Sequence, residues 1–351
     1  MKTSKSIPSL RALSSVGLVW VLTLSFISSQ TSDFTSRDQV KAFHHPQTDL
    51  ILPREIAGFQ VEEISRYGKS GFEGDDISIR YLSPNHKVDV YLYQRDDKLL
   101  ENDENHQAII GQIRETQQVI QQLATKKKIY SNVKIGDQAQ VYTFGDGITM
   151  IEAKMSYRQQ VANNDIFDNN DLESSVAVAI YAHYFIKIRH TFVTPKDEKS
   201  LALRQQKQQQ FRESLCQLIA DTEIRPDIIK ALKTFQSQPQ DPDSIGAIAA
   251  YAEESELVHI SIQAEYMPYL EQENFKGSEI LLVAHMAGNI NAQLKNMTFT
   301  SHDLEGLQQM LKTYQLLKKS NAVTTNATLD RWSQLKPTQL TKLMEQLNQK
   351  K

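Results

Sequence analysis

The sequence predicts an α+β fold: an antiparallel sheet built from hairpins, with helices covering one face, followed by a mainly helical C-terminal lobe. Short runs of β-branched and aromatic residues alternate with turn residues, which is typical of hairpins. Two longer segments carry apolar residues at steps of three and four, which is typical of amphipathic helices. Beyond position 243 helical spacing dominates. The expected order of the first domain is βββαβββα.

The first half of the sheet is expected before residue 95. Its strands are predicted at 58–68, 77–82 and 88–94, and Ser83-Pro84-Asn85 lies between the second and the third. Turn residues between two alternating runs indicate a hairpin. A helix over 103–128 follows, since Ile109, Ile113 and Ile120 recur at helical spacing.

The second half of the sheet repeats this order. Strands are expected at 139–144 and 148–157, joined by Gly145-Asp146-Gly147, because Asp-Gly between apolar runs is a strong hairpin signal. One long strand is expected over 175–192, and then a helix over 196–221. In that helix Cys216 shares the spacing of apolar neighbours, which favours a buried thiol over a nucleophile.

The C-terminal part is expected to be a separate lobe. Pro and Asp residues near 237–243 indicate a linker before it. A strand predicted over 257–264 cannot satisfy its backbone alone, so we expect it to pair with an edge of the first sheet, docking the lobe there, or with a partner chain. Helices are predicted at 244–254, 278–294, 302–319 and 337–348. The expected divisions are a signal peptide 1–29, a flexible lead-in 30–50, an α+β domain 51–225, a linker 226–243 and the lobe 244–351.

The N-terminus has the pattern of a secretory signal. Three basic residues, Lys2, Lys5 and Arg11, precede an apolar run over 16–27, and small polar residues follow it. The run is too short for the roughly 20 residues of a membrane-spanning helix. We expect cleavage after Ser28 or Ser29, which places the mature protein in the periplasm or outside the cell without a transmembrane segment. An uncleaved anchor is the alternative.

Composition excludes several classes of function. The formal net charge is −3, and duplex-binding surfaces need a basic excess, so no nucleic-acid partner is expected. One cysteine excludes an internal disulfide and any zinc site with several thiolates. His44 and His45 lie in the lead-in without a rigid third ligand, so we expect only adventitious metal binding there.

The segment 165–173 offers a set of candidate metal ligands. Oxygen ligands lie close together, as Ca²⁺ requires, but the spacing is not that of an EF-hand loop. No other cofactor is expected, and a solvated connecting loop is the alternative. The candidate ligands are Asp165, Asp168, Asn170, Asp171 and Glu173.

The helix over 278–294 carries the most suggestive pattern for binding. His285, Asn289 and Gln293 are spaced four residues apart and form a polar stripe. This stripe predicts a patch that contacts a ligand or a partner, or else an ordinary solvated side of a packed helix. Ala284 and Gly288 keep another side small, which permits close approach of a neighbouring helix.

The sequence contains no complete phosphate loop, no G-x-S-x-G motif and no H-E-x-x-H motif. Gly68-Lys69-Ser70 resembles the end of a phosphate loop, but Glu63 stands where that loop needs a glycine. The hypothesis is therefore an exported, non-catalytic binding or scaffolding protein of the cell envelope, with an envelope protein or a small ligand as its partner. The alternative is an exported enzyme, for example a hydrolase, in which the fold gathers His183 or His285 with carboxylates in a cleft.

Overall fold

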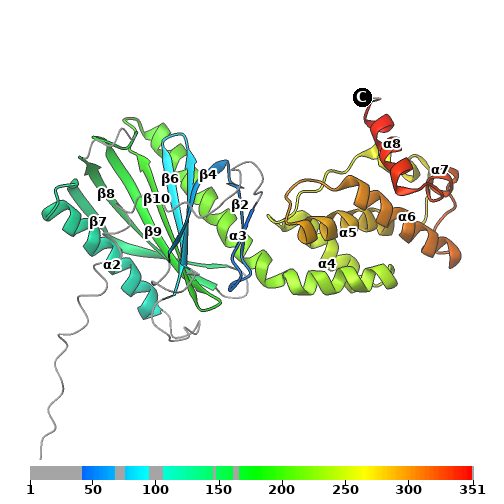
Figure 1. Ribbon diagram of the computed structural model, residues 1–351, viewed down its shortest axis with the longest axis horizontal. Coiled ribbons are helices and arrows are strands. Elements are labelled where there is room, and N and C mark those ends of the chain that lie inside the picture. Colours follow the sequence, from blue (N-terminus) through cyan, green and yellow to red (C-terminus); the bar gives the residue numbers. More distant parts are fainter. Residues whose placement is uncertain (1–41, 68–75, 95–105, 145–147, 161–165, 350–351) are drawn as a thin grey trace, which may run out of the picture.

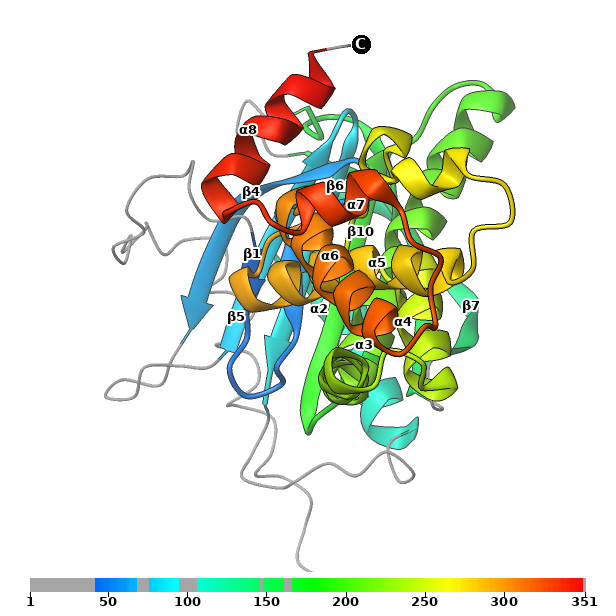
Figure 2. The same ribbon diagram turned by 90° about the vertical axis from the view of Figure 1, so that its right-hand side faces the viewer.

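The computed structural model describes residues 42–67, 76–94, 106–144, 148–160 and 166–349. An antiparallel sheet with two helices forms one end of an elongated molecule, and a bundle of helices forms the other (Figures 1 and 2). We call them the sheet region and the helical region. This is the α+β architecture with a helical C-terminal part that the sequence predicts. In the described residues, no helix combines the length and the apolar character needed to cross a membrane.

Eight strands of the described chain form one antiparallel sheet from two meanders. The meanders β4-β5-β6 and β7-β8-β9-β10 meet where β6 pairs with β10, with Leu92 opposite Ile186. In sheet order the strands are β3 (Glu55–Ile56), β4 (Phe59–Tyr67), β5 (Asp76–Ser83), β6 (His86–Tyr93), β10 (Tyr184–Val193), β9 (Asp171–Tyr181), β8 (Ile148–Gln159) and β7 (Tyr130–Phe144).

The two helices of the sheet region lie on opposite faces of the sheet, so the prediction of one covered face is wrong. Helix α2 (His106–Thr125) packs on Val176, Val178 and Ile180. Helix α3 (Glu198–Ser237) packs on the intervening Ala177 and Ala179. Because this stretch of β9 is apolar on both sides, both faces need a cover.

The expected strand over 175–192 is a hairpin instead. Ala182 and His183 form a two-residue turn between β9 and β10, with φ values of 46° and 67°. Positive φ at both central residues is the geometry of a type I′ turn, which usually takes Asn or Gly. Ala182 and His183 are not residues of that kind, so no local pattern marks this turn. His183 therefore lies in an exposed turn, and His190 is buried on β10.

The end of the expected flexible lead-in is ordered. Strand β1 (Ala42–His44) pairs with β2 (Ile51–Pro53), and Phe43 packs into the core of the sheet region. His45 is buried, with Nδ1 2.9 Å from Thr48 Oγ1. Burial of Phe43 accounts for the order of this hairpin. The expected signal peptide and the rest of the lead-in up to residue 41 lie outside the described residues.

Helix α3 belongs to both regions. Its first half buries Phe211 and Leu215 in the core below the sheet, and its second half buries Leu232 and Phe235 in the helical region. The predicted linker over 226–243 is therefore helical up to Ser237, because Pro226 is accommodated inside the helix. Only the short segment 238–241 separates α3 from α4.

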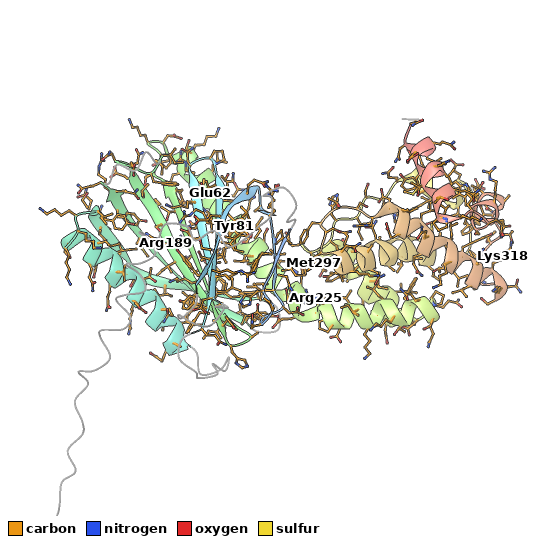
Figure 3. The ribbon with its side chains drawn as sticks, in the orientation of Figure 1. Glu62, Tyr81, Arg189, Arg225, Met297 and Lys318 are labelled. Atoms are coloured by element: carbon orange, nitrogen blue, oxygen red, sulfur yellow. The ribbon has the colours of Figure 1, made fainter. Side chains whose placement is uncertain are left out.

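Side-chain contacts join the two regions at the middle of α3. The Arg225 guanidinium pairs with the Asp49 carboxylate, and its Nη2 donates to the Asp49 carbonyl oxygen at 3.1 Å. Figure 3 shows Arg225 between the regions. Leu257 belongs to the core of the sheet region, and Phe299 packs against it, although both follow α4 in the chain.

The helical region is built around the close contact of α5 with α6, which lie side by side (Figure 2). A Cβ on Gly288 of α5 would lie 2.3 Å from the Glu305 carbonyl oxygen of α6. The small side of α5 therefore has the role that the sequence predicts. The elements are α4 (Pro242–Glu254), η2 (Ala264–Tyr266), η3 (Pro268–Glu271), α5 (Ser278–Asn296), α6 (Asp303–Lys319), α7 (Ala327–Trp332) and α8 (Pro337–Asn348).

Candidate functional site

The polar stripe of α5 is part of the interior. The exposed fractions of His285, Asn289 and Gln293 are 0%, 0% and 1%. The structure does bring these residues together, on the side of α5 that faces the segment 257–263 and the start of α6. Because all three side chains are buried, they offer no patch to a ligand or partner from solution.

Gln293 explains why no strand forms over 257–264. Its Oε1 accepts from the His259 backbone N–H at 2.9 Å, and its Nε2 donates to the His259 carbonyl oxygen at 2.7 Å. The Ser261 backbone N–H donates to Ser301 Oγ at 3.1 Å. Side chains thus satisfy a backbone that we expected to pair with a sheet edge or a partner chain, and the predicted strand is wrong.

Asn289 performs the same task for the loop between α5 and α6. Its Oδ1 accepts from the His302 backbone N–H at 2.7 Å and from Gln293 Nε2 at 2.8 Å. Its Nδ2 donates to Ser301 Oγ at 3.0 Å. Every part of this amide therefore contributes to the internal structure of the helical region.

His285 is enclosed by packing. Neither ring nitrogen has a hydrogen-bond partner among the described residues, and a Cβ on Gly306 would lie 2.8 Å from His285 Nδ1. Burial lowers the pKa of His285, although the Asp303 carboxylate and the Ser261 backbone partly oppose this. The ring does not line a cleft with carboxylates, which was the arrangement expected of the alternative enzyme.

The candidate calcium ligands are engaged with protein groups where the structure describes them. Asp168 Oδ1 accepts from Gln159 Nε2 at 2.8 Å, and Asp171 pairs with Arg158 at 3.4 Å. Asn170 Nδ2 donates to the Ile166 carbonyl oxygen at 2.9 Å, and Glu173 lies on β9, where burial raises its pKa. Asp165 lies outside the described residues. Among those described, no three His, Cys, Asp or Glu side chains gather as metal ligands.

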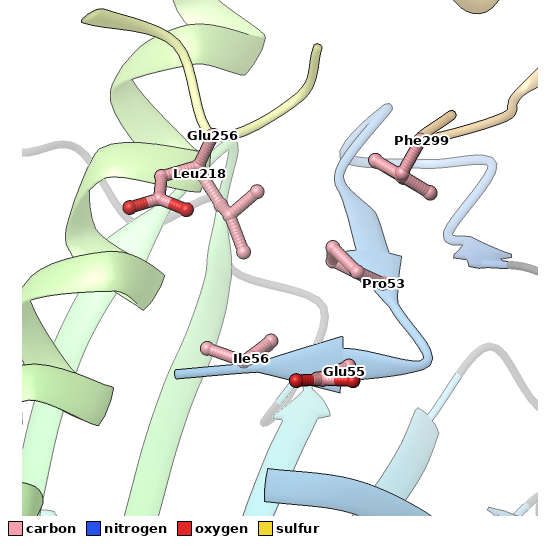
Figure 4. A pocket seen from close by; sticks show the side chains of 6 residues that line it. All are labelled: Pro53, Glu55, Ile56, Leu218, Glu256 and Phe299. Atoms are coloured by element: carbon pink, nitrogen blue, oxygen red, sulfur yellow. The ribbon is translucent and has the colours of Figure 1, made fainter. Parts of the chain in front are cut away.

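A small pocket lies where the two regions meet (Figure 4). Its cavity volume is about 70 Å³. The two carboxylates on its wall already accept hydrogen bonds, Glu55 from Gln60 and Glu256 from Ser214. The pocket is lined by Pro53, Glu55, Ile56, Leu218, Glu256 and Phe299. It is too small for most drug-sized ligands, which occupy pockets of roughly 300–1,000 Å³.

A pair of buried histidines lies on the α3 face of the sheet. His86 Nδ1 is 3.1 Å from His190 Nε2, and the ring of Phe59 meets both at right angles. Burial, with Lys207 and Arg204 nearby, lowers the pKa of His86 to about 4. Burial and the neighbouring His86 lower the pKa of His190 as well. These rings are therefore neutral core groups at neutral pH.

The opposite face of the sheet collects positive charge beside α2. Helix α2 lies on β7, β8 and β9. On the same face, the strands β5, β6 and β10 carry half-buried basic and aromatic side chains. Within this group, Arg80 pairs with Glu63 and with Asp89. We call this surface the basic face and define it by Arg80, Lys87, Tyr91, Lys187 and Arg189.

Aromatic rings hold the lysines of the basic face. Lys187 Nζ lies 4.8 Å from the centre of the Tyr91 ring and 5.1 Å from that of Tyr93. Lys87 Nζ lies 4.8 Å from the ring of Phe167. Such contacts fix the position of a cation without neutralising its charge.

Sequence reasoning missed the basic face. The alternation of Ile186 and Ile188 with Lys187 and Arg189 does place two cations on one side of a strand. This strand pairs with β6, where Asp89 and Tyr91 lie opposite Arg189 and Lys187. The two strands are far apart in the chain, so no local sequence pattern predicts their pairing.

Comparison with models of known protein families and with curated proteins gives no match for this chain.

Proposed function

We propose that this chain is an exported, non-catalytic binding protein of the cell envelope, and that it binds a negatively charged partner through the basic face. The signal pattern of residues 1–29 supports export to the periplasm or the cell exterior. The basic face supports binding, because it groups four cations on one side of the neighbouring strands β5, β6 and β10.

The single observation that carries this proposal is a local excess of positive charge on an otherwise acidic chain. The whole chain has a net charge of −3, yet one sheet face collects Arg80, Lys87, Lys187 and Arg189. Clustered charge of one sign steers oppositely charged partners. Tyr91 and Tyr93 beside the lysines add ring surface of the kind that is enriched at interfaces.

Charge reversal tests the proposal. Tagged mature protein is used to capture components of an envelope fraction. The test variant carries both Lys87→Glu and Lys187→Glu. The control variant carries both Lys233→Glu and Lys342→Glu. The second pair is exposed in the helical region and changes the net charge equally. We expect one reproducible component to bind the wild type and the control, and to be lost from the basic-face variant and at high salt.

Equal capture by both variants would contradict the basic face as the binding surface. Turnover of a substrate by the pure protein would contradict the absence of catalysis. Native mass spectrometry of the extracytoplasmic protein tests export: a mass that retains residues 1–29 would contradict signal cleavage.

A further inference from the structure

Arg189 of the basic face contacts tyrosines of β7 and β8. Its Nη2 donates to the Tyr157 hydroxyl at 2.9 Å and lies 3.5 Å from that of Tyr130. Its Nε is buried and has no hydrogen-bond partner among the described residues. A guanidinium has five N–H donors, so most of its capacity is unused by those residues.

The charge of Arg189 is also unbalanced within the described residues. No carboxylate there lies within the 4.0 Å of an ion pair with it. Asp89 stands directly opposite Arg189 in the strand register, but its Oδ1 accepts from Arg80 Nε at 2.8 Å. Burying a cation without a counter-charge costs free energy, and proteins normally pair such a group.

The phenols around Arg189 offer dipoles but do not supply a counter-charge by themselves. Burial raises the pKa of Tyr157, but Arg189 and hydrogen bonds with Ser174 and Thr191 outweigh it, so this pKa lies below its ordinary value. The surroundings of the guanidinium thus favour a negative charge at this position.

We propose that Arg189 binds an oxyanion, a carboxylate or phosphate group of the partner. This inference rests on the proposed function, since Arg189 belongs to the basic face. An oxyanion accepts from a guanidinium through two parallel hydrogen bonds and supplies the missing counter-charge. Arg189 as a whole residue is half-buried. The rings of Tyr91, Tyr130 and Tyr157 flank the position.

Titration of the full mature chain with sodium phosphate and with sodium acetate, at constant ionic strength against chloride, tests this site. Calorimetry gives the affinity, and thermal unfolding gives the shift in Tm. We expect at least one of the two anions to bind the wild type and raise its Tm. Arg189→Gln should weaken binding by about 100-fold and Arg189→Lys by about tenfold, because the ammonium lacks the planar fork. Arg331→Gln, an equal loss of charge on exposed α7, should bind like the wild type.

Vesicles distinguish the source of the oxyanion. Binding to phosphatidylcholine vesicles that contain phosphatidylglycerol, but not to pure phosphatidylcholine, would identify a lipid headgroup if Arg189→Gln abolishes it. A response to free phosphate or acetate alone would identify a soluble ligand. If the wild type responds to none of these, or if Arg189→Gln and Arg189→Lys bind like the wild type, the inference is overturned.

Folding of the variants is checked by circular dichroism. If Arg189→Gln does not fold, Arg189→Lys still tests the site, because it keeps the positive charge. The results that would contradict the proposed function differ from those that would contradict the oxyanion site. If Arg189→Gln retains the captured envelope component while the Lys87 and Lys187 variant loses it, only the oxyanion site is wrong. If that double variant also retains the component, the basic face is not the binding surface.

Discussion

The polar side chains of α5 in the helical region and those of the basic face in the sheet region differ in burial and in hydrogen bonding. On α5, Asn289 and Gln293 are completely buried, and their amides hydrogen-bond to the backbone of neighbouring segments. On the basic face, Arg189 is half-buried and retains donors without acceptors among the described residues. Both sets follow the period of their element, 3.6 residues in one case and two in the other.

This difference shows that periodic polar residues define a face but not its role. An amide carries a donor and an acceptor and can therefore replace a backbone neighbour, as Gln293 does for His259. A guanidinium carries only donors and a full charge, so neutral neighbours such as Tyr157 leave it incompletely paired. The chemistry of the residue, together with what packs on it, distinguishes an internal support from a binding surface.

The strongest way to break the helical region is to separate α5 from α6. Gly288→Ala places a Cβ 2.3 Å from the Glu305 carbonyl oxygen, so the helices must move apart. We expect a loss of about 3 kcal/mol or more in the free energy of unfolding, measured with urea, because backbone cannot yield as a flexible side chain does. Gly246→Ala is the control, since its Cβ meets nothing within 4 Å, and it should stabilise α4 slightly. Equal stability of the two variants would show that the contact is looser than the structure indicates.

Acid should destabilise the sheet region by protonating His86 and His190. The unfolded chain protonates these rings near pH 6.5, whereas His86 in the folded protein does so only at about 4. Stability is therefore full above pH 6.5 and is lost as the pH falls toward 4. The loss at pH 4 is roughly 3 kcal/mol, since one pKa unit corresponds to about 1.4 kcal/mol. Urea unfolding of the wild type between pH 7 and pH 4.5 measures the slope.

The variant His86→Gln should flatten this pH dependence, because it removes one ring of the pair. His183→Asn, in the exposed turn between β9 and β10, serves as the control because Asn tolerates positive φ. If both variants keep the slope of the wild type, other groups cause the loss in acid.

Removal of one amide from α5 should have a smaller effect that tests its internal role. Gln293→Ala leaves the backbone N–H and carbonyl of His259 without their partner, and we expect a loss of about 2 kcal/mol in urea unfolding. Asn291→Ala changes an exposed residue of the same helix and should change stability by less than about 0.5 kcal/mol. An unaltered stability of Gln293→Ala would mean that water satisfies His259 equally well.

Elements with strong local signals were predicted closely. Helices α5 and α6 begin and end within about two residues of their expected bounds, because apolar residues at helical spacing mark them locally. The turn at Ala182 and His183 was missed since it lacks Gly and Asn, and the continuity of α3 was missed because Pro226 usually ends a helix.

The candidate site was harder to predict than the fold. His285, Asn289 and Gln293 were correctly placed on one side of a helix, but their burial depends on the segment 257–263 and α6, which the spacing does not reveal. The surroundings of Arg189 combine β6, β8 and β10, and their adjacency is a property of the whole sheet.

The pairing of β6 with β10 has a consequence for the order in which the protein folds. Each meander joins neighbouring segments and can form early, whereas β6 must wait until α2 and three further strands have been made before β10 exists. Closing that long loop costs conformational entropy before the contacts between β6 and β10 can offset this cost. During this interval the apolar residues of β6, including Val88 and Val90, have no cover from α3. A chain that leaves the ribosome from its N-terminus is then most exposed to pairing with a strand of another molecule.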